Sequence, residues 1–267
     1  MRVSVFLDHL RDIVSQKGCT LAAAMKEAKK SGVDYVEVNA GTIANPEDFM
    51  RLLGQTGLEV GGLYSFFDFG HKDQPDEIRS TVEMAEKLKA HIILAIPGYF
   101  DEGDDHEAVR ERMAASLDTL CTEAAIRGLH TTIEDFDSDR VPYGTAEEVM
   151  WFLERIPRLG CTFDTGNFLY HGQDVLKAYD LLEPRIQHVH MKDRGYRGMA
   201  GEEPVISVKG RKLYAAPVGS GELPMAEIVR RLYERGYDGI CAMEHFGARD
   251  QLLYMRRSAR WMKNIFR

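Results

Sequence analysis

The sequence predicts a single (β/α)₈ TIM barrel domain that spans residues 1–267. Three observations lead to this α/β fold class. Short runs rich in Val, Ile and Phe alternate with longer helical stretches along the whole chain, as βαβ units do. The length of 267 residues is usual for one barrel of this kind. No shift in composition and no Ser/Gly-rich linker divides the chain, which argues against a domain boundary.

Eight strands are expected, one in each βα unit. Their central residues are apolar, as in a parallel sheet that is covered on both faces. The predicted strands are Val3–Leu7, Tyr35–Asn39, Glu59–Phe66, His91–Pro97, Leu129–Asp135, Gly160–Asp164, Ile186–Met191 and Gly239–Glu244.

The helices between these strands have recognisable ends. Thr20 precedes a predicted helix over residues 21–30, and Gly32 follows it as a stop signal. Thr145 begins another helix, and Glu148 three residues later completes a capping box. The order strand, loop, helix and glycine then repeats along the chain.

One long segment interrupts this order after the seventh strand. About 30 residues separate His190 from Leu223, and loops of that length inside a compact domain are usually functional. We expect a capping loop over residues 192–223 that closes over a bound substrate. Residues 206–208 and 212–214 flank a Lys-Gly-Arg turn, so the loop should contain a small hairpin.

Composition narrows the class of protein. The formal net charge of −8 repels phosphate backbones, which argues against nucleic-acid binding. No segment approaches the roughly 20 apolar residues of a membrane span, and the first strand begins too early for a signal peptide, so we expect a cytoplasmic protein without membrane contact. Four cysteines without a CxxC pair predict reduced, mostly buried thiols: Cys19, Cys121, Cys161 and Cys241.

Acids and a histidine stand at the ends of four consecutive predicted strands, namely Glu134, Asp164, His190 and Glu244. Barrel enzymes place their sites at this end of the strands, and neighbouring strands lie about 4.8 Å apart, so the four side chains can converge on one ion. Three carboxylates and one imidazole suit a hard divalent cation. We expect one Mn²⁺, with Mg²⁺, Co²⁺ or Zn²⁺ as alternatives.

These strand ends resemble the xylose isomerase-like TIM barrel superfamily, which includes the sugar phosphate isomerases and epimerases. The resemblance covers nearly the whole chain. It rests on Glu134, on Asp-Thr-Gly-Asn at 164–167, on His-x-His-x-Lys-Asp at 188–193 and on Glu-His-Phe at 244–246. Two positions depart from the keto-sugar 3-epimerases: Asn167 stands where they carry His, and Arg140 stands where they carry Glu.

The resemblance implies a metal-dependent isomerase or epimerase that acts on a sugar, keto acid or cyclic polyol. Proton transfer next to a carbonyl would proceed through an enediolate, with Glu134 and Glu244 both binding the metal and moving the proton. A dehydratase or lyase of the inosose or dehydroshikimate type is the alternative, because the same ligands serve both reactions. A DNA-repair endonuclease is less favoured, because the chain is acidic and the third and fourth strands end without a metal ligand.

Five further residues are candidates for contact with a small carbohydrate-like substrate: Asn167, His188, Arg194, Glu37 and Phe66. Period-two geometry points His188 into the barrel with His190, where a structural role is as well supported as substrate contact. The same alternative holds for Glu37, and Arg194 could equally lie solvated on the surface. A homo-oligomer formed through outer helices is left open.

Overall fold

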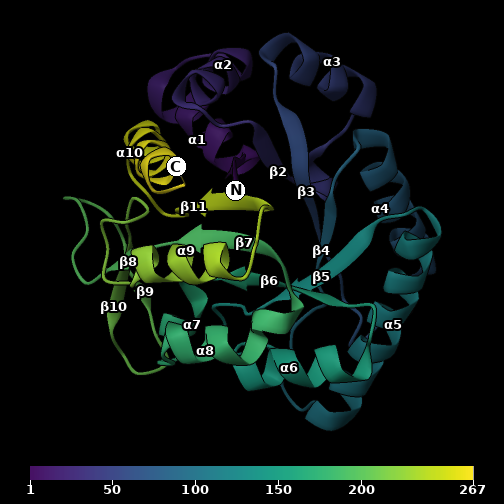
Figure 1. The fold of residues 1–267 in the computed structure, drawn as a ribbon. Coiled ribbons are helices and arrows are strands. Elements are labelled where there is room, and N and C mark those ends of the chain that lie inside the picture. Colours follow the sequence, from purple (N-terminus) through teal and green to yellow (C-terminus); the bar gives the residue numbers. More distant parts are fainter. Residues whose placement is uncertain (267) are drawn as a thin grey trace.

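The computed structural model describes residues 1–266 and consists of a closed barrel of eight parallel strands with helices around it (Figure 1). The strands follow one another around the barrel in the order β1, β2, β3, β4, β5, β6, β7 and β11. The predicted (β/α)₈ barrel is therefore confirmed. The barrel strands are β1 (Arg2–Phe6), β2 (Tyr35–Asn39), β3 (Glu59–Phe66), β4 (Ile92–Ile96), β5 (His130–Glu134), β6 (Gly160–Asp164), β7 (Ile186–Lys192) and β11 (Ile240–Glu244).

The helices form the outer layer in Figure 1, and several begin and end where the sequence predicts. Thr20 caps α2, which ends at a left-handed Gly32, and the capping box of Thr145 and Glu148 opens α6. The helices are α1 (Leu7–Lys17), α2 (Leu21–Ser31), α3 (Pro46–Thr56), α4 (Pro75–Leu88), α5 (His106–Ile126), α6 (Ala146–Arg155), α7 (Asn167–Tyr170), α8 (Val175–Leu182), α9 (Met225–Glu234) and α10 (Gln251–Ile265).

The first unit differs from the simple repeat, because two helices lie between β1 and β2. Helix α1 begins at Leu7, which the sequence pattern had assigned to the first strand. Gly18 ends α1 with a φ of 64°, a conformation that glycine adopts without a steric penalty, and α2 begins three residues later. This arrangement leaves α1 directly above the carboxyl end of β1.

The long segment after β7 folds into a small antiparallel sheet. Its strands are β8 (Arg194–Gly195), β9 (Val205–Ile206) and β10 (Lys212–Ala215), in the order β8, β10, β9. The expected hairpin is therefore present, with its first strand starting one residue early and ending after Ile206. Asp193 ties the two ends of the segment together, because its carboxylate accepts bonds from the backbone N–H groups of Gly219 and Gly221, each at 2.9 Å.

The core fills the barrel and the layer between strands and helices. The four cysteines are free, and Cys19 is half-buried while the other three are buried: Cys121, Cys161 and Cys241. Within residues 1–266, no helix has both the length and the apolar character needed to cross a bilayer.

Candidate metal centre

The four predicted metal ligands meet at the carboxyl end of the barrel. They lie on β5, β6, β7 and β11, which are consecutive in the barrel, and each has at most 7% of its surface exposed. The Nδ1 atom of His190 is 2.9 Å from Oε2 of Glu134 and 3.3 Å from Oε2 of Glu244. Ligand atoms of Glu134, Asp164 and His190 all lie within 4.8 Å of one another. Three of the four predicted ligands therefore lie close together with Glu244 beside His190, and their binding of a metal stays a prediction.

Three of these buried atoms have no hydrogen-bond partner: Oε2 of Glu134, Oδ2 of Asp164 and Nδ1 of His190. Buried polar atoms are nearly always paired, because an unpaired one retains the full cost of its desolvation. The other oxygen of Asp164 accepts bonds from the N–H groups of Gly166 at 2.7 Å and Asn167 at 2.9 Å, which fix the carboxylate. Three potential ligand atoms that lack hydrogen bonds and face one another fit a divalent cation.

The Asp-Thr-Gly-Asn turn brings these groups close to β7. A side chain at Gly166 would lie 2.6 Å from the backbone oxygen of Lys192, so only glycine allows the approach. The hydroxyl of Thr165 then bonds to the backbone of Lys192, donating to its oxygen and accepting from its N–H, each at 2.9 Å. The turn after β6 is therefore fastened to the end of β7.

Lys192 extends the same inward face of β7 as His188 and His190. Its ammonium group is buried and lies 2.7 Å from Oε1 of Glu244 and 2.6 Å from Oδ1 of Asn167. Asp137, in the loop after β5, is a third partner at 3.3 Å. Lys192 was predicted to begin the loop, whereas β7 continues one residue further and carries the ammonium group of Lys192 into the site.

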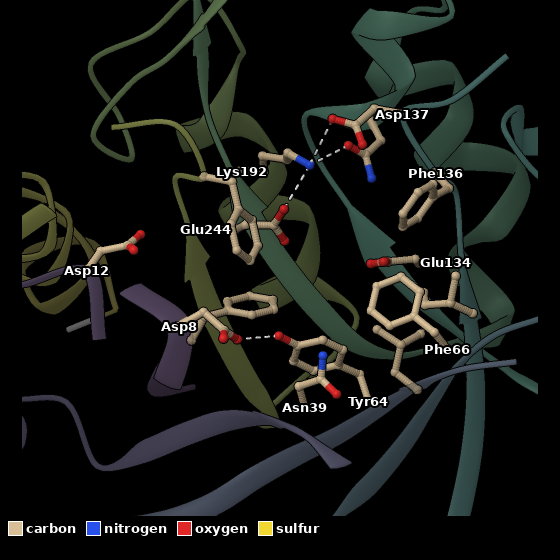
Figure 2. Close-up of a pocket in the computed structure, with 15 residues that line it drawn as sticks. Asp8, Asp12, Asn39, Tyr64, Phe66, Glu134, Phe136, Asp137, Lys192 and Glu244 are labelled. Carbon is tan, nitrogen blue, oxygen red and sulfur yellow. Dashed lines mark hydrogen bonds and ion pairs between the residues drawn. The ribbon is translucent and has the colours of Figure 1, made fainter. Parts of the chain in front are cut away.

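A cavity of about 460 Å³ opens at the candidate metal ligands, and Glu134 and Glu244 are part of its wall (Figure 2). Its volume lies in the range of small-molecule sites, and aromatic rings form much of its wall. The polar lining residues are Asp8, Asp12, Asn39, Glu134, Asp137, Asn167, Lys192 and Glu244, and the remaining lining residues are Phe6, Tyr64, Phe66, Leu94, Ile96, Phe136 and Phe246.

The family described as "Xylose isomerase-like TIM barrel" matches residues 25–265 of the chain. The chain belongs to this family. It is 22% identical to fructoselysine 3-epimerase of Escherichia coli O157:H7, over 82% of this chain and 74% of that protein.

Solved structures of the same architecture include a probable 3-DHS dehydratase from Bacillus anthracis, with a TM-score of 0.75 and 17% identity over 99% of both chains. A D-allulose 3-epimerase from Methylomonas sp. superposes with a TM-score of 0.76 and 16% identity, over 99% of this chain and 98% of that one. At such low identities the two structures support the fold alone.

Two of the predicted substrate contacts of this xylose isomerase-like barrel lie on the cavity wall. Phe66 is half exposed at the rim, and Asn167 lies beside Lys192. The amide of Asn167 also donates to the backbone oxygen of Asp135 at 2.7 Å, so its orientation is fixed. Both residues are placed to touch a ligand in the cavity.

Glu37 and His188 lie below the cavity instead. Oε2 of Glu37 is 3.3 Å from Nε2 of His188, and both side chains are buried. A side chain at Gly62 on β3 would lie 2.1 Å from the same carboxylate oxygen, so the glycine leaves room for the pair. Their contact with substrate stays a prediction, and this position favours support of the neighbouring His190.

Arg194 is buried behind the wall, where its guanidinium donates to Oδ2 of Asp137 at 2.6 Å. No residue from 193 to 223 is among those that line the cavity, so closure of the capping loop and a reach of Arg194 into the site stay predictions. Arg194 in this position holds Asp137 next to Lys192.

The wall opposite the candidate metal ligands carries residues that were not predicted from the sequence. Asp8 and Asp12 come from α1 and Tyr64 from β3, and all three line the cavity. Recognising α1 would have revealed the first two, because residues four apart share one helix face. Tyr64 gives no signal of its own, because an inward aromatic on a strand is typical of ordinary core packing.

The charges in the site are unevenly balanced. Burial raises the pKa of Asp164 well above its usual range, and burial also raises the pKa of Glu134. Burial would raise the pKa of Glu244 too, but Lys192 and His190 outweigh it and hold that pKa well below its usual range. Glu134 and Asp164 therefore gain most from an added cation, because His190 beside Glu134 and Lys192 at 3.9 Å from Asp164 do not offset the effect of burial.

Proposed function

We propose that this barrel is a metal-dependent isomerase or epimerase that moves a proton next to the carbonyl of a carbohydrate-like substrate. The observation that carries the proposal is the set of three buried, unpartnered ligand atoms directly beneath an aromatic-walled cavity. The similarity to a fructoselysine 3-epimerase supports the same class of reaction.

Glu134, Asp164, His190 and Glu244 would hold one divalent cation, with Mn²⁺ as the first choice. When bound, the cation supplies Lewis-acid polarisation of a carbonyl oxygen, which acidifies the neighbouring C–H group. Asp164 fits the role of a pure ligand, because its side chain is fully buried and is not among the cavity-lining residues.

Glu134 and Glu244 are the candidates for moving the proton. Both line the cavity, and they approach His190 from strands on opposite sides of β7 and β6. A substrate carbon between them presents one face to each carboxylate, so one can take a proton and the other can return it. The wall of Phe66, Tyr64 and neighbouring rings would exclude water from the carbanion.

A dehydratase is the second candidate, and one observation favours it. The ammonium group of Lys192 lies 2.7 Å from Glu244, and no ion pair joins it to Glu134 among the described contacts. An ammonium group beside only one of the two glutamates makes them unequal. Such an arrangement suits a reaction in which a group on one side of the substrate removes a proton and a group on the other side assists a departing hydroxyl. The chain also shares its fold with a probable 3-DHS dehydratase, so this barrel architecture is compatible with a dehydratase.

Solvent isotope exchange tests the proposal. Mn²⁺-loaded protein is incubated in heavy water with a panel of ketoses, keto acids and cyclic keto-polyols, and NMR follows deuterium incorporation and product formation. Exchange with a rearranged or epimerised product supports the proposed reaction, and exchange with loss of water supports the dehydratase. Absence of exchange for the whole panel, with metal bound, would contradict both. The Glu134→Gln and Glu244→Gln variants serve as matched controls.

A further inference from the structure

The segment after β7 exposes a cluster of apolar side chains. Ten large hydrophobic side chains are exposed in the described part of the chain, and five of them lie within residues 196–208. Single exposed hydrophobic residues are ordinary on a protein surface, whereas several gathered on one surface mark contact with another molecule. These five residues form the capping patch: Tyr196, Met199, Val205, Ile206 and Val208.

The capping patch belongs to the small antiparallel sheet. Val205 and Ile206 form β9, which pairs with β10 and lies at the edge of that sheet, and both residues are exposed. The guanidinium group of Arg211 lies 5.9 Å from the ring centre of Tyr196, so the patch continues beside β10. No residue from 193 to 223 lines the cavity. The chain therefore leaves the patch uncovered and does not use it to close its own cavity.

Basic side chains surround the capping patch. Residues 195–212 contain one exposed acid, Glu203, and four exposed cations that form no ion pair among the described residues: Arg197, Lys209, Arg211 and Lys212. The whole chain has a formal charge of −8, so this surface is locally positive on a negative protein. Unpaired cations next to exposed apolar groups favour a partner surface that is acidic and apolar.

The opposite side of the barrel mouth has this complementary character. Strands β3 and β7 lie four positions apart in the ring of eight, and Figure 1 shows α4 and α5 on the side of the barrel away from β8, β9 and β10. The loops after β3 and β4, residues 67–74 and 97–105, contain a single lysine or arginine, Lys72. Phe66 is half exposed beside them. Six carboxylates of these loops form the acidic rim: Asp68, Asp73, Asp101, Glu102, Asp104 and Asp105.

A two-fold axis brings the two surfaces together. Both lie on the face formed by the carboxyl ends of the strands, because both directly follow barrel strands. A second copy is turned by 180° about an axis that lies in this face and is perpendicular to the line from β7 to β3. Its capping patch then covers the acidic rim of the first copy, and the same rotation places the first capping patch over the second rim. Both contacts therefore form at once.

We propose that this face is the interface of a two-fold dimer in which the capping patch of each copy covers the acidic rim of the other. The partner's Ile206 then packs against the exposed ring of Phe66, and the partner's basic side chains lie against the carboxylates of the rim. Each copy supplies the lid of the other cavity, which its own segment after β7 does not cover. The dimer does not depend on which reaction the cavity performs.

The mass of the particle in solution tests the proposal. Light scattering and sedimentation equilibrium should give two chains for the parent protein. Ile206→Asp places a charge in both contacts of the dimer, so it should raise the dissociation constant by at least about tenfold. Ile126→Asp makes the same change at an exposed apolar residue of α5, outside the two surfaces, and should leave the dimer unchanged. Circular dichroism confirms that both variants fold.

Charge reversal tests which surfaces meet. One variant carries Arg211→Glu and Lys212→Glu in the segment after β7, and the other carries Asp73→Lys and Glu102→Lys in the acidic rim. All four parent residues are exposed and form no ion pair among the described residues. Each variant alone opposes like charges at both contacts and should be a single chain. An equal mixture should form a dimer of the two variants, because every contact then pairs opposite charges.

Three results would overturn the proposal. A parent protein that stays a single chain at high concentration has no such interface, and its capping patch is then free to close over its own cavity. A dimer that survives Ile206→Asp and both charge reversals forms through another surface, such as the outer helices. Two folded single-chain variants that do not associate when mixed would show that the capping patch and the acidic rim do not meet.

Discussion

The two ends of the barrel differ in how their charged side chains are used. At the amino end of the strands, the guanidinium group of Arg185 donates to the backbone oxygen of Leu153 at 2.7 Å, and that of Arg235 donates to the oxygen of Ile186 at 2.8 Å. The hydroxyl of Tyr237 likewise donates to Ile240. These side chains satisfy carbonyls that would otherwise be unpaired.

At the carboxyl end, more deeply buried polar atoms lack a hydrogen bond. Oε2 of Glu134, Oδ2 of Asp164 and Nδ1 of His190 face one another without a hydrogen bond of good geometry, although Nδ1 of His190 forms an ion pair with Glu134 at 2.9 Å. The difference indicates that the amino end is organised for stability and the carboxyl end for a ligand. Removing a polar group should therefore have opposite consequences at the two ends.

The largest expected effect is on turnover at the carboxyl end. Glu134→Gln and Glu244→Gln preserve volume but remove a base, so activity should fall by about 10²- to 10⁴-fold. Glu59→Gln makes the same change at the exposed amino end of β3 and should leave activity unchanged. Initial rates on the substrate identified by isotope exchange provide the measurement. Full turnover in both site variants would contradict a catalytic role for the carboxyl end.

The second expected effect is a gain in stability without metal. Asp164→Asn keeps the oxygen that accepts from Gly166 and Asn167 but removes a buried charge next to Glu134. The chelator-treated variant should therefore melt a few degrees higher than the chelated parent, since about 1 kcal/mol corresponds to roughly 2–4 °C at this size. Calorimetry with and without metal measures it. A lower melting temperature in chelator would show that the carboxylate is stabilising.

The third effect has the opposite sign and belongs to the amino end. Arg185→Met leaves carbonyl groups near the end of α6 without their donor, so unfolding should become easier by about 1–3 kcal/mol. Chemical denaturation measures the loss. Metal content and turnover of the surviving folded protein should match those of the parent. A large loss of metal would indicate that the two ends are not independent.

The smallest effect concerns the exposed rim of the carboxyl end. Hydrogen bonds to Asp104 and Asp68 raise the pKa of His71. A raised pKa in the folded state stabilises the protein below the unfolded pKa, and this stabilisation is lost as pH rises through the folded value. His71→Gln should therefore lower the melting temperature at pH 5.5, by less than about 3 °C, and leave it unchanged at pH 9. An equal loss at both pH values would point to packing instead.

The sequence was informative wherever a residue type was tied to a strand end or a helix cap. The four candidate metal ligands could be placed together because parallel strands bring their carboxyl ends to one edge, and Thr20 and Thr145 were predicted because caps are local. The predicted seventh strand ended one residue too early, which left Lys192 on the loop. That residue decides whether its side chain points into the barrel.

The opposite wall could not be predicted by the same reasoning. Asp8 and Asp12 belong to a helix that the strand pattern had partly absorbed, and Tyr64 reads as core packing until its hydroxyl is seen to donate to Asp8. Long-range pairs such as Arg194 with Asp137 depend on the path of the loop after β7. Those pairs arise from tertiary packing, which leaves no local spacing in the sequence.

The central claim is that Glu134, Asp164, His190 and Glu244 form one divalent-cation site, and metal titration tests it most directly. Chelator-treated parent protein is titrated with Mn²⁺ by calorimetry, alongside Asp164→Asn and the amino-end control Glu59→Gln. The account predicts one ion per chain for the parent and the control, and greatly weakened binding for Asp164→Asn. Binding of equal strength and stoichiometry in all three, or no binding by the parent, would contradict it.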